Sequence, residues 1–80
     1  MEDEDISARI SRLAEEERRL HAEHVGTGLS EADARRLVSI ETQLDQCWDL
    51  LRQRRALREM GEDPDQAGVR DERTVEGYLQ

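Results

Sequence analysis

The sequence predicts an all-α protein: an antiparallel two-helix hairpin over residues 1–61, followed by an irregular C-terminal tail over residues 62–80. Two long stretches, at about 4–25 and 31–60, carry apolar residues every three or four positions, which is the period of a helix face. The short sequence GTG separates them, and a short loop between amphipathic helices makes antiparallel packing the default. Aligning the two stretches about this loop sets apolar residues opposite apolar residues. These observations together indicate the hairpin.

The first helix is predicted from an apolar stripe and acidic residues at its start. The stripe consists of Ile6, Ile10, Leu13 and Leu20, with Glu17 and His24 at the remaining positions of the same face. Asp3 or Asp5 can cap the first turn, and acidic residues there favour the positive end of the helix dipole. The helix should end near Val25, because glycine follows.

The second helix has clear signals at both ends. Ser30 is a good N-cap, with Asp33 three residues later as a short-armed capping box. Gly61 is positioned for a left-handed C-cap, and Pro64 prevents continuation. The apolar face between these ends comprises Leu37, Ile40, Leu44, Cys47, Trp48 and Leu51, widened by Leu50 and Leu57.

The tail begins with the polar sequence EDPDQAGVRDER, which has no sustained period, so we expect it to be irregular. Its end regains three apolar residues, Val75, Tyr78 and Leu79. Two uses of this end remain open: it docks back on the helices, or it serves as a short linear motif for a partner.

The hairpin predicts which residues face each other. With the turn centred near Thr27 and Gly28, the numbers of two facing residues sum to about 55–57. The expected apolar pairs are Leu20 with Leu37, Leu13 with Leu44, Ile10 with Cys47 or Trp48, and Ile6 with Leu51. The acidic start, Glu2, Asp3 and Glu4, falls beside Arg52, Arg54 and Arg55, with Arg54 facing the seam. Such pairing would neutralise much of the arginine-dense end.

One hairpin cannot cover the whole apolar arc of the second helix. Leu50 and Leu57 lie well away from the direction of Leu37, Leu44 and Trp48 around this helix. A second copy would supply the missing cover, so we expect a homodimer that forms an antiparallel four-helix bundle. The apolar end of the tail is the intramolecular competitor.

Composition restricts the possible functions of this 80-residue chain. Its net charge is −8, which disfavours broad attraction to nucleic acid or to anionic lipid. No stretch approaches the roughly 20 apolar residues of a membrane span, and Cys47 is the only cysteine. These features are typical of a protein of the reducing cytoplasm, and we expect no membrane association.

No combination of residues indicates a cofactor, a metal or catalysis. Glu17, His21 and His24 have a helical spacing that suits a transition metal, but no further ligand accompanies them. Cys47 lacks a nearby base, and Asp45 and Asp49 would raise the pKa of its thiol. An intermolecular or redox-sensing disulfide is the alternative to a nucleophile, and it is slightly favoured over it. We therefore expect a protein that is not an enzyme.

The leading hypothesis is a non-enzymatic protein-interaction or adaptor module of the bacterial cytosol. The residues proposed to form its interaction surface are Trp48, Leu51, Arg54, Arg55, Tyr78 and Leu79. The alternative is a nucleic-acid-associated regulator that uses Arg52, Arg55 and Arg58. The net charge and the acidic strip beside these arginines make nucleic acid the less favoured partner.

Three stretches, LDQCWDLLRQRRALRE (residues 44–59), GEDPD (61–65) and VEGYLQ (75–80), carry a family likeness. The chain resembles, over nearly its whole length, a group of short uncharacterised actinobacterial proteins, domain of unknown function family 2630. The resemblance implies an intracellular bacterial protein of similar size. It implies no activity and no site residues.

Overall fold

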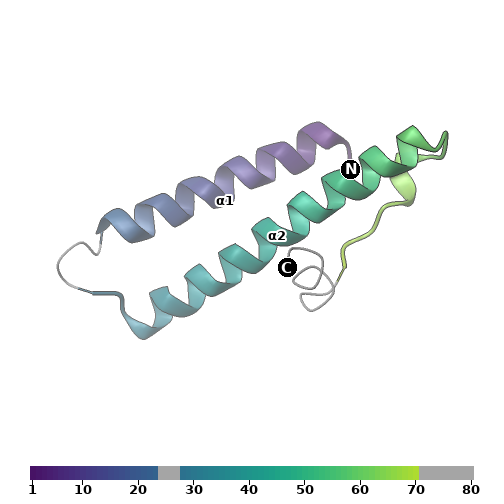
Figure 1. The fold of residues 1–80 in the computed structure, drawn as a ribbon. Coiled ribbons are helices and arrows are strands. Elements are labelled where there is room, and N and C mark those ends of the chain that lie inside the picture. Colours follow the sequence, from purple (N-terminus) through teal and green to yellow (C-terminus); the bar gives the residue numbers. More distant parts are fainter. Residues whose placement is uncertain (24–27, 71–80) are drawn as a thin grey trace.

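The computed structural model describes residues 1–23 and 28–70. These described residues form two long α-helices, α1 (Asp3–Glu23) and α2 (Glu31–Glu59), and one 3-10 turn, η1 (Pro64–Gln66). The helices lie side by side and run in opposite directions, and the described residues contain no strand (Figure 1). The predicted all-α hairpin is confirmed. The expected helix end at Val25 lies outside the described residues.

The start of α1 uses its acidic residues for two different purposes. The backbone N–H of Glu2 donates to Oδ2 of Asp5 at 2.8 Å, so Asp5 satisfies an otherwise unpaired donor at the helix start. Asp3 points instead to α2, where its carboxylate accepts hydrogen bonds from two arginines. Asp5 therefore provides the local contact, and Asp3 ties the two helices together.

The predicted N-cap Ser30 and the left-handed Gly61 at the end of α2 are confirmed. The side chain of Ser30 accepts a hydrogen bond from the N–H of Asp33 at 3.1 Å. Gly61 has φ +76°, and the N–H of the following residue, Glu62, donates to the carbonyl of Leu57 at 2.8 Å. This bond and the left-handed glycine form a Schellman motif, which turns the chain back towards the helix.

A thin core holds the hairpin together. The buried core cluster comprises Ile6, Leu13, Ile40, Cys47 and Leu50, with Ile10, Leu20, Leu44, Leu51 and Ala67 packed against it. Both members of three expected pairs thus belong to this core, whereas Leu37, expected opposite Leu20, is buried without being part of the cluster. Of the two partners expected for Ile10, Cys47 is buried in the cluster, whereas Trp48 is 50% exposed.

The first part of the tail follows a defined path. From η1 the chain runs back along α2 towards the middle of that helix (Figure 1). Gln53 donates to the carbonyl of Gly68 at 2.8 Å and accepts from the N–H of the same residue at 3.3 Å, and Gln46 donates to the carbonyl of Arg70 at 3.1 Å. Ala67 packs against the core cluster that includes Leu50. Part of the apolar arc of α2 is therefore covered by the chain itself.

Candidate functional site

Arg54 occupies the centre of the arginine-dense end of α2, and it is 4% exposed. Its Nε donates to Oδ1 of Asp3, and its Nη1 donates to Oδ1 of Asp65 at 2.9 Å and to the carbonyl of Pro64 at 3.2 Å. Its Nη2 lies 3.7 Å from a carboxylate oxygen of Glu2. One guanidinium thus joins the start of α1, the end of α2 and η1.

Arg58 completes this ionic cluster from one helical turn further along α2. Its Nη2 and Nη1 donate to the two carboxylate oxygens of Asp3 at 2.7 and 3.2 Å. The hydrogen bonds from Arg58 and Arg54 hold the pKa of Asp3 below its ordinary value, and the Arg54 guanidinium does the same to the pKa of Asp65. The cluster therefore consists of charges that are already matched within the chain.

The expected pairing of the acidic start with the arginines holds for Arg54. Arg52 and Arg55 instead lie beside acids of their own helix: Arg55 donates to Glu59 at 3.2 Å, and Arg52 lies 4.0 Å from Asp49. The sum of two residue numbers gives the level at which residues face each other along the helices. It does not give the direction in which each side chain leaves its helix. Positions 54 and 58 share a face, whereas Arg55 is turned about 100° from Arg54.

The sequence did not lead us to expect that Asp49 of α2 is buried. Asp49 is 1% exposed, and its Oδ2 accepts a hydrogen bond from Gln53 at 2.8 Å and lies 3.5 Å from Nε of Arg70. The i,i+4 spacing of Asp49 and Gln53 was the available signal. Asp49 and Gln53 together hold the segment after η1 against the helix.

Cys47 is buried, and burial raises the pKa of its thiol, opposed by the positive charge of Arg9. The direction of this shift is the one expected from the sequence. Its cause is loss of solvent rather than repulsion by the neighbouring aspartates. A protonated, enclosed thiol is a poor nucleophile and a poor redox sensor.

The six residues proposed as an interaction surface lie in different settings. Trp48 is half-exposed, and Arg55 is exposed. Leu51 packs against the core, and Arg54 is engaged in the ionic cluster. Tyr78 and Leu79 lie outside the described residues. Of the four that lie within the described residues, Trp48 and Arg55 are therefore the ones exposed to a partner.

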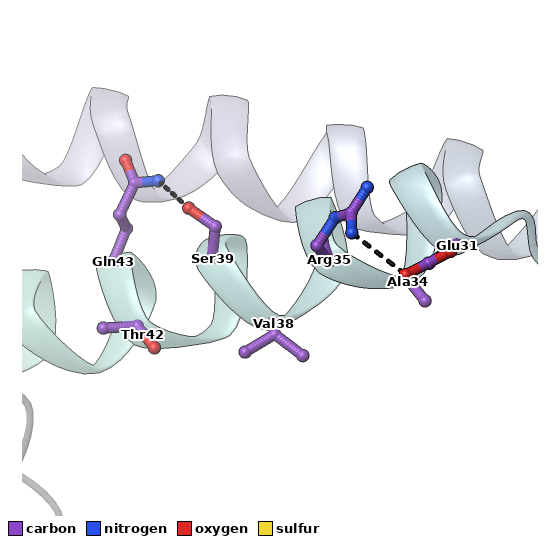
Figure 2. Close-up of a pocket in the computed structure, with 7 residues that line it drawn as sticks. All are labelled: Glu31, Ala34, Arg35, Val38, Ser39, Thr42 and Gln43. Carbon is purple, nitrogen blue, oxygen red and sulfur yellow. Dashed lines mark hydrogen bonds and ion pairs between the residues drawn. The ribbon is translucent and has the colours of Figure 1, made fainter.

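A depression on the outer surface of α2 is a second candidate. Its lining residues are Glu31, Ala34, Arg35, Val38, Ser39, Thr42 and Gln43, all from the N-terminal half of α2 (Figure 2). Gln43 donates to Ser39 at 3.0 Å and Arg35 donates to Glu31 at 3.1 Å, so the polar residues along one side bond to each other. Val38, 61% exposed, projects freely from the helix. The sequence feature that could have indicated this depression is the spacing of four between the small or branched residues Ala34, Val38 and Thr42.

The metal hypothesis involved Glu17, His21 and His24. His24 lies outside the described residues, so its placement relative to His21 is not part of the structure. Within residues 1–23 and 28–70, no group of three or more His, Cys, Asp or Glu side chains is arranged to hold a metal ion. In the same part of the chain, no helix is long and apolar enough to cross a membrane.

Comparison with known proteins identifies relatives over almost the whole chain. Residues 2–80 match the family described as protein of unknown function (DUF2630). The chain is 51% identical over 77 residues to the uncharacterized protein Rv0898c of Mycobacterium tuberculosis and to the uncharacterized protein Mb0922c of Mycobacterium bovis, which covers 95% of this chain and 88% of each relative. No solved structure matches. The resemblance noted in the sequence is confirmed, and the chain belongs to the DUF2630 family.

Proposed function

We propose that this protein is a non-enzymatic protein-interaction module of the bacterial cytosol, and that it pairs with a second copy through the side of the hairpin that carries Trp48. The observation that carries the proposal is the exposure of Trp48, which is 50%. Tryptophan is a frequent anchor of protein interfaces, because it buries a large apolar area and still offers an N–H donor.

The neighbours of Trp48 support this side of the hairpin. Leu44 and Leu51, one turn before and one turn after Trp48, are half-buried and pack against the core. Trp48 therefore lies at the edge of the core, where a partner helix could extend the packing outwards. A second hairpin related by a two-fold axis would present the same residues in return and yield a four-helix bundle.

The thin core is a second reason for an apolar partner. Six apolar side chains are buried in the described part of the chain: Ile6, Leu13, Leu37, Ile40, Cys47 and Leu50. A domain of this size gains little stability from so small a core, and oligomerisation is a common remedy. Pairing would bury Trp48 and stabilise the hairpin at the same time.

The charges favour a protein partner over nucleic acid. Arg58 is bonded to Asp3, Arg55 to Glu59, and Arg52 lies near Asp49. A phosphate backbone would have to displace these carboxylates, and it would meet a chain of net charge −8. A gel-shift titration tests this alternative: binding that weakens steeply with salt would support a nucleic-acid regulator.

Light scattering after size-exclusion chromatography tests the pairing. We expect the mass of a dimer for the wild-type chain and a strong shift towards the monomer for Trp48→Glu. The matched control is Val38→Glu, the same introduced charge at an exposed apolar residue on another face of α2, which should remain dimeric. A wild-type chain that stays monomeric at all concentrations would contradict the homodimer, and a dimeric Trp48→Glu variant would contradict the surface.

A further inference from the structure

We propose that residues 75–79 bind, within the same chain, to the depression on α2 that contains Ala34, Val38 and Thr42. The C-terminal end of the chain would then continue the path that residues 64–70 already follow. Val38, in this depression, lies about 80° around α2 from Trp48, and the inference does not depend on the proposed pairing.

The direction of the described tail carries the first step. Pro64 accepts a hydrogen bond from Arg54, Gly68 exchanges two with Gln53, and Arg70 accepts one from Gln46. As the residue number rises along the tail, the number of its partner on α2 falls. The tail therefore runs antiparallel to α2, and at Arg70 it is heading for the N-terminal half of that helix.

The depression begins directly ahead on this face of α2 and continues around the helix to Val38 and Ala34. Seven residues span close to two helical turns, so positions seven apart share a face. Ser39 follows Gln53 and Gln46 in this spacing, since the three positions are 53, 46 and 39. Thr42 and Arg35 follow Asp49 in the same spacing, since these positions are 49, 42 and 35. Arg35, Ser39 and Thr42, which line the depression, thus lie on the same side of α2 as the residues that contact the tail.

The remaining chain has the length to reach this depression. At about 1.5 Å per residue, Val38 lies about 12 Å and Ala34 about 18 Å along the helix from Gln46. At no more than about 3.3 Å per residue, Val75 can lie up to about 16 Å and Tyr78 up to about 26 Å beyond Arg70. Val75 therefore reaches Val38, and Tyr78 reaches Ala34, without full extension of the chain.

The chemistry of the two partners also fits. Val75, Tyr78 and Leu79 are the large apolar residues among the last ten of the chain. The depression offers the exposed methyl groups of Val38, the Cβ of Ala34 and the aliphatic stem of Arg35. The guanidinium of Arg35 is exposed beside Glu31, and the face of a tyrosine ring is a favourable neighbour for such a cation.

Solution NMR of the full-length chain tests the contact directly. We expect nuclear Overhauser effects between the ring protons of Tyr78 and the methyl groups of Val38 or Ala34. A sample mixed from labelled and unlabelled chains distinguishes contacts within one chain from contacts between chains. Absence of these signals would overturn the proposal, and so would signals found only between chains, which would identify a second copy as the occupant.

Two pairs of variants tie the signals to the proposed residues. Val38→Asp should abolish the contacts of Tyr78, whereas Ala8→Asp, the same change at an exposed position of α1, should leave them intact. Tyr78→Ala should shift the amide resonances of residues 34–43, whereas Tyr78→Phe, which keeps the ring, should not. Contacts of Tyr78 that survive Val38→Asp in a folded chain would contradict the assignment.

The Trp48→Glu variant, which we expect to be monomeric, separates the two proposals. If the tail binds in the same chain, the contact between Tyr78 and Val38 persists in this variant. If pairing fails in the wild-type chain, the tail experiment still gives an independent answer.

Discussion

At the scale of the residue, Arg54 shows how one buried charge can organise a small protein. Removing a charged group from water is costly, and the cost is offset only by close and well-directed partners. Arg54 meets Asp3, Asp65 and the carbonyl of Pro64 with different nitrogen atoms of a planar guanidinium. A lysine amine could not span these three acceptors in the same way. Arg54 therefore ties the start of α1 and η1 to the same point on α2.

Acid should weaken this cluster in a defined direction. The hydrogen bonds from Arg58 and Arg54 lower the pKa of Asp3 in the folded chain, and Arg54 lowers the pKa of Asp65. A lowered folded-state pKa stabilises the fold at pH values above the unfolded-state pKa, which is about 4, and this stabilisation is lost as the pH falls through the folded-state pKa. We expect Asp3→Asn to lower Tm near neutral pH, and the difference from wild type to shrink as the pH falls below about 4.

Thermal unfolding followed by circular dichroism across this pH range provides the measurement. Glu4→Gln removes a neighbouring exposed carboxylate and serves as the control, with a small difference from wild type throughout. A difference between Asp3→Asn and wild type that stays constant from neutral to acid pH would show that Asp3 acts through packing rather than through its charge.

At the scale of the element, local signals made the helices predictable. The Ser30 cap and the Gly61 stop depend on residues within one turn, and both were predicted from the sequence alone. The contacts of Gln53 with Gly68 and of Asp49 with Arg70 could not be predicted, because they depend on where residues 64–70 return after the Schellman turn. For the same reason, the pairing of Arg54 was predicted with Asp3 and missed with Asp65.

The Gly61 turn should tolerate no side chain without loss of stability. Its φ of +76° lies in the left-handed region, where a Cβ is disfavoured by about 1–2 kcal/mol. We expect Gly61→Ala to lower the free energy of unfolding by about 1 kcal/mol in urea titrations. Gly68→Ala is the matched control, because Gly68 has no positive φ and a Cβ there meets no atom within 4 Å. Equal losses for the two variants would contradict a conformational cause at Gly61.

At the scale of the whole molecule, the rest of the described chain packs against some sides of α2 and leaves others exposed. α1 covers one side, and residues 64–70 cover a second side beside Leu50 and Asp49. Trp48 and Val38 remain exposed on two further directions of the same helix. We assign the first to a second copy and the second to the end of the chain, so a long helix with a thin core would become enclosed on all sides.

Concentration dependence should reveal how much of the stability comes from pairing. Mass action raises the Tm of a protein whose folded form associates, because added protein shifts the equilibrium towards the folded dimer. We expect the Tm of the wild-type chain to rise with protein concentration and that of Trp48→Glu to stay constant. Ile40→Ala, at a fully buried residue, should lower the free energy of unfolding by about 2–5 kcal/mol yet keep the concentration dependence. A Tm that rises equally in wild type and Trp48→Glu would place the association on a surface other than that of Trp48.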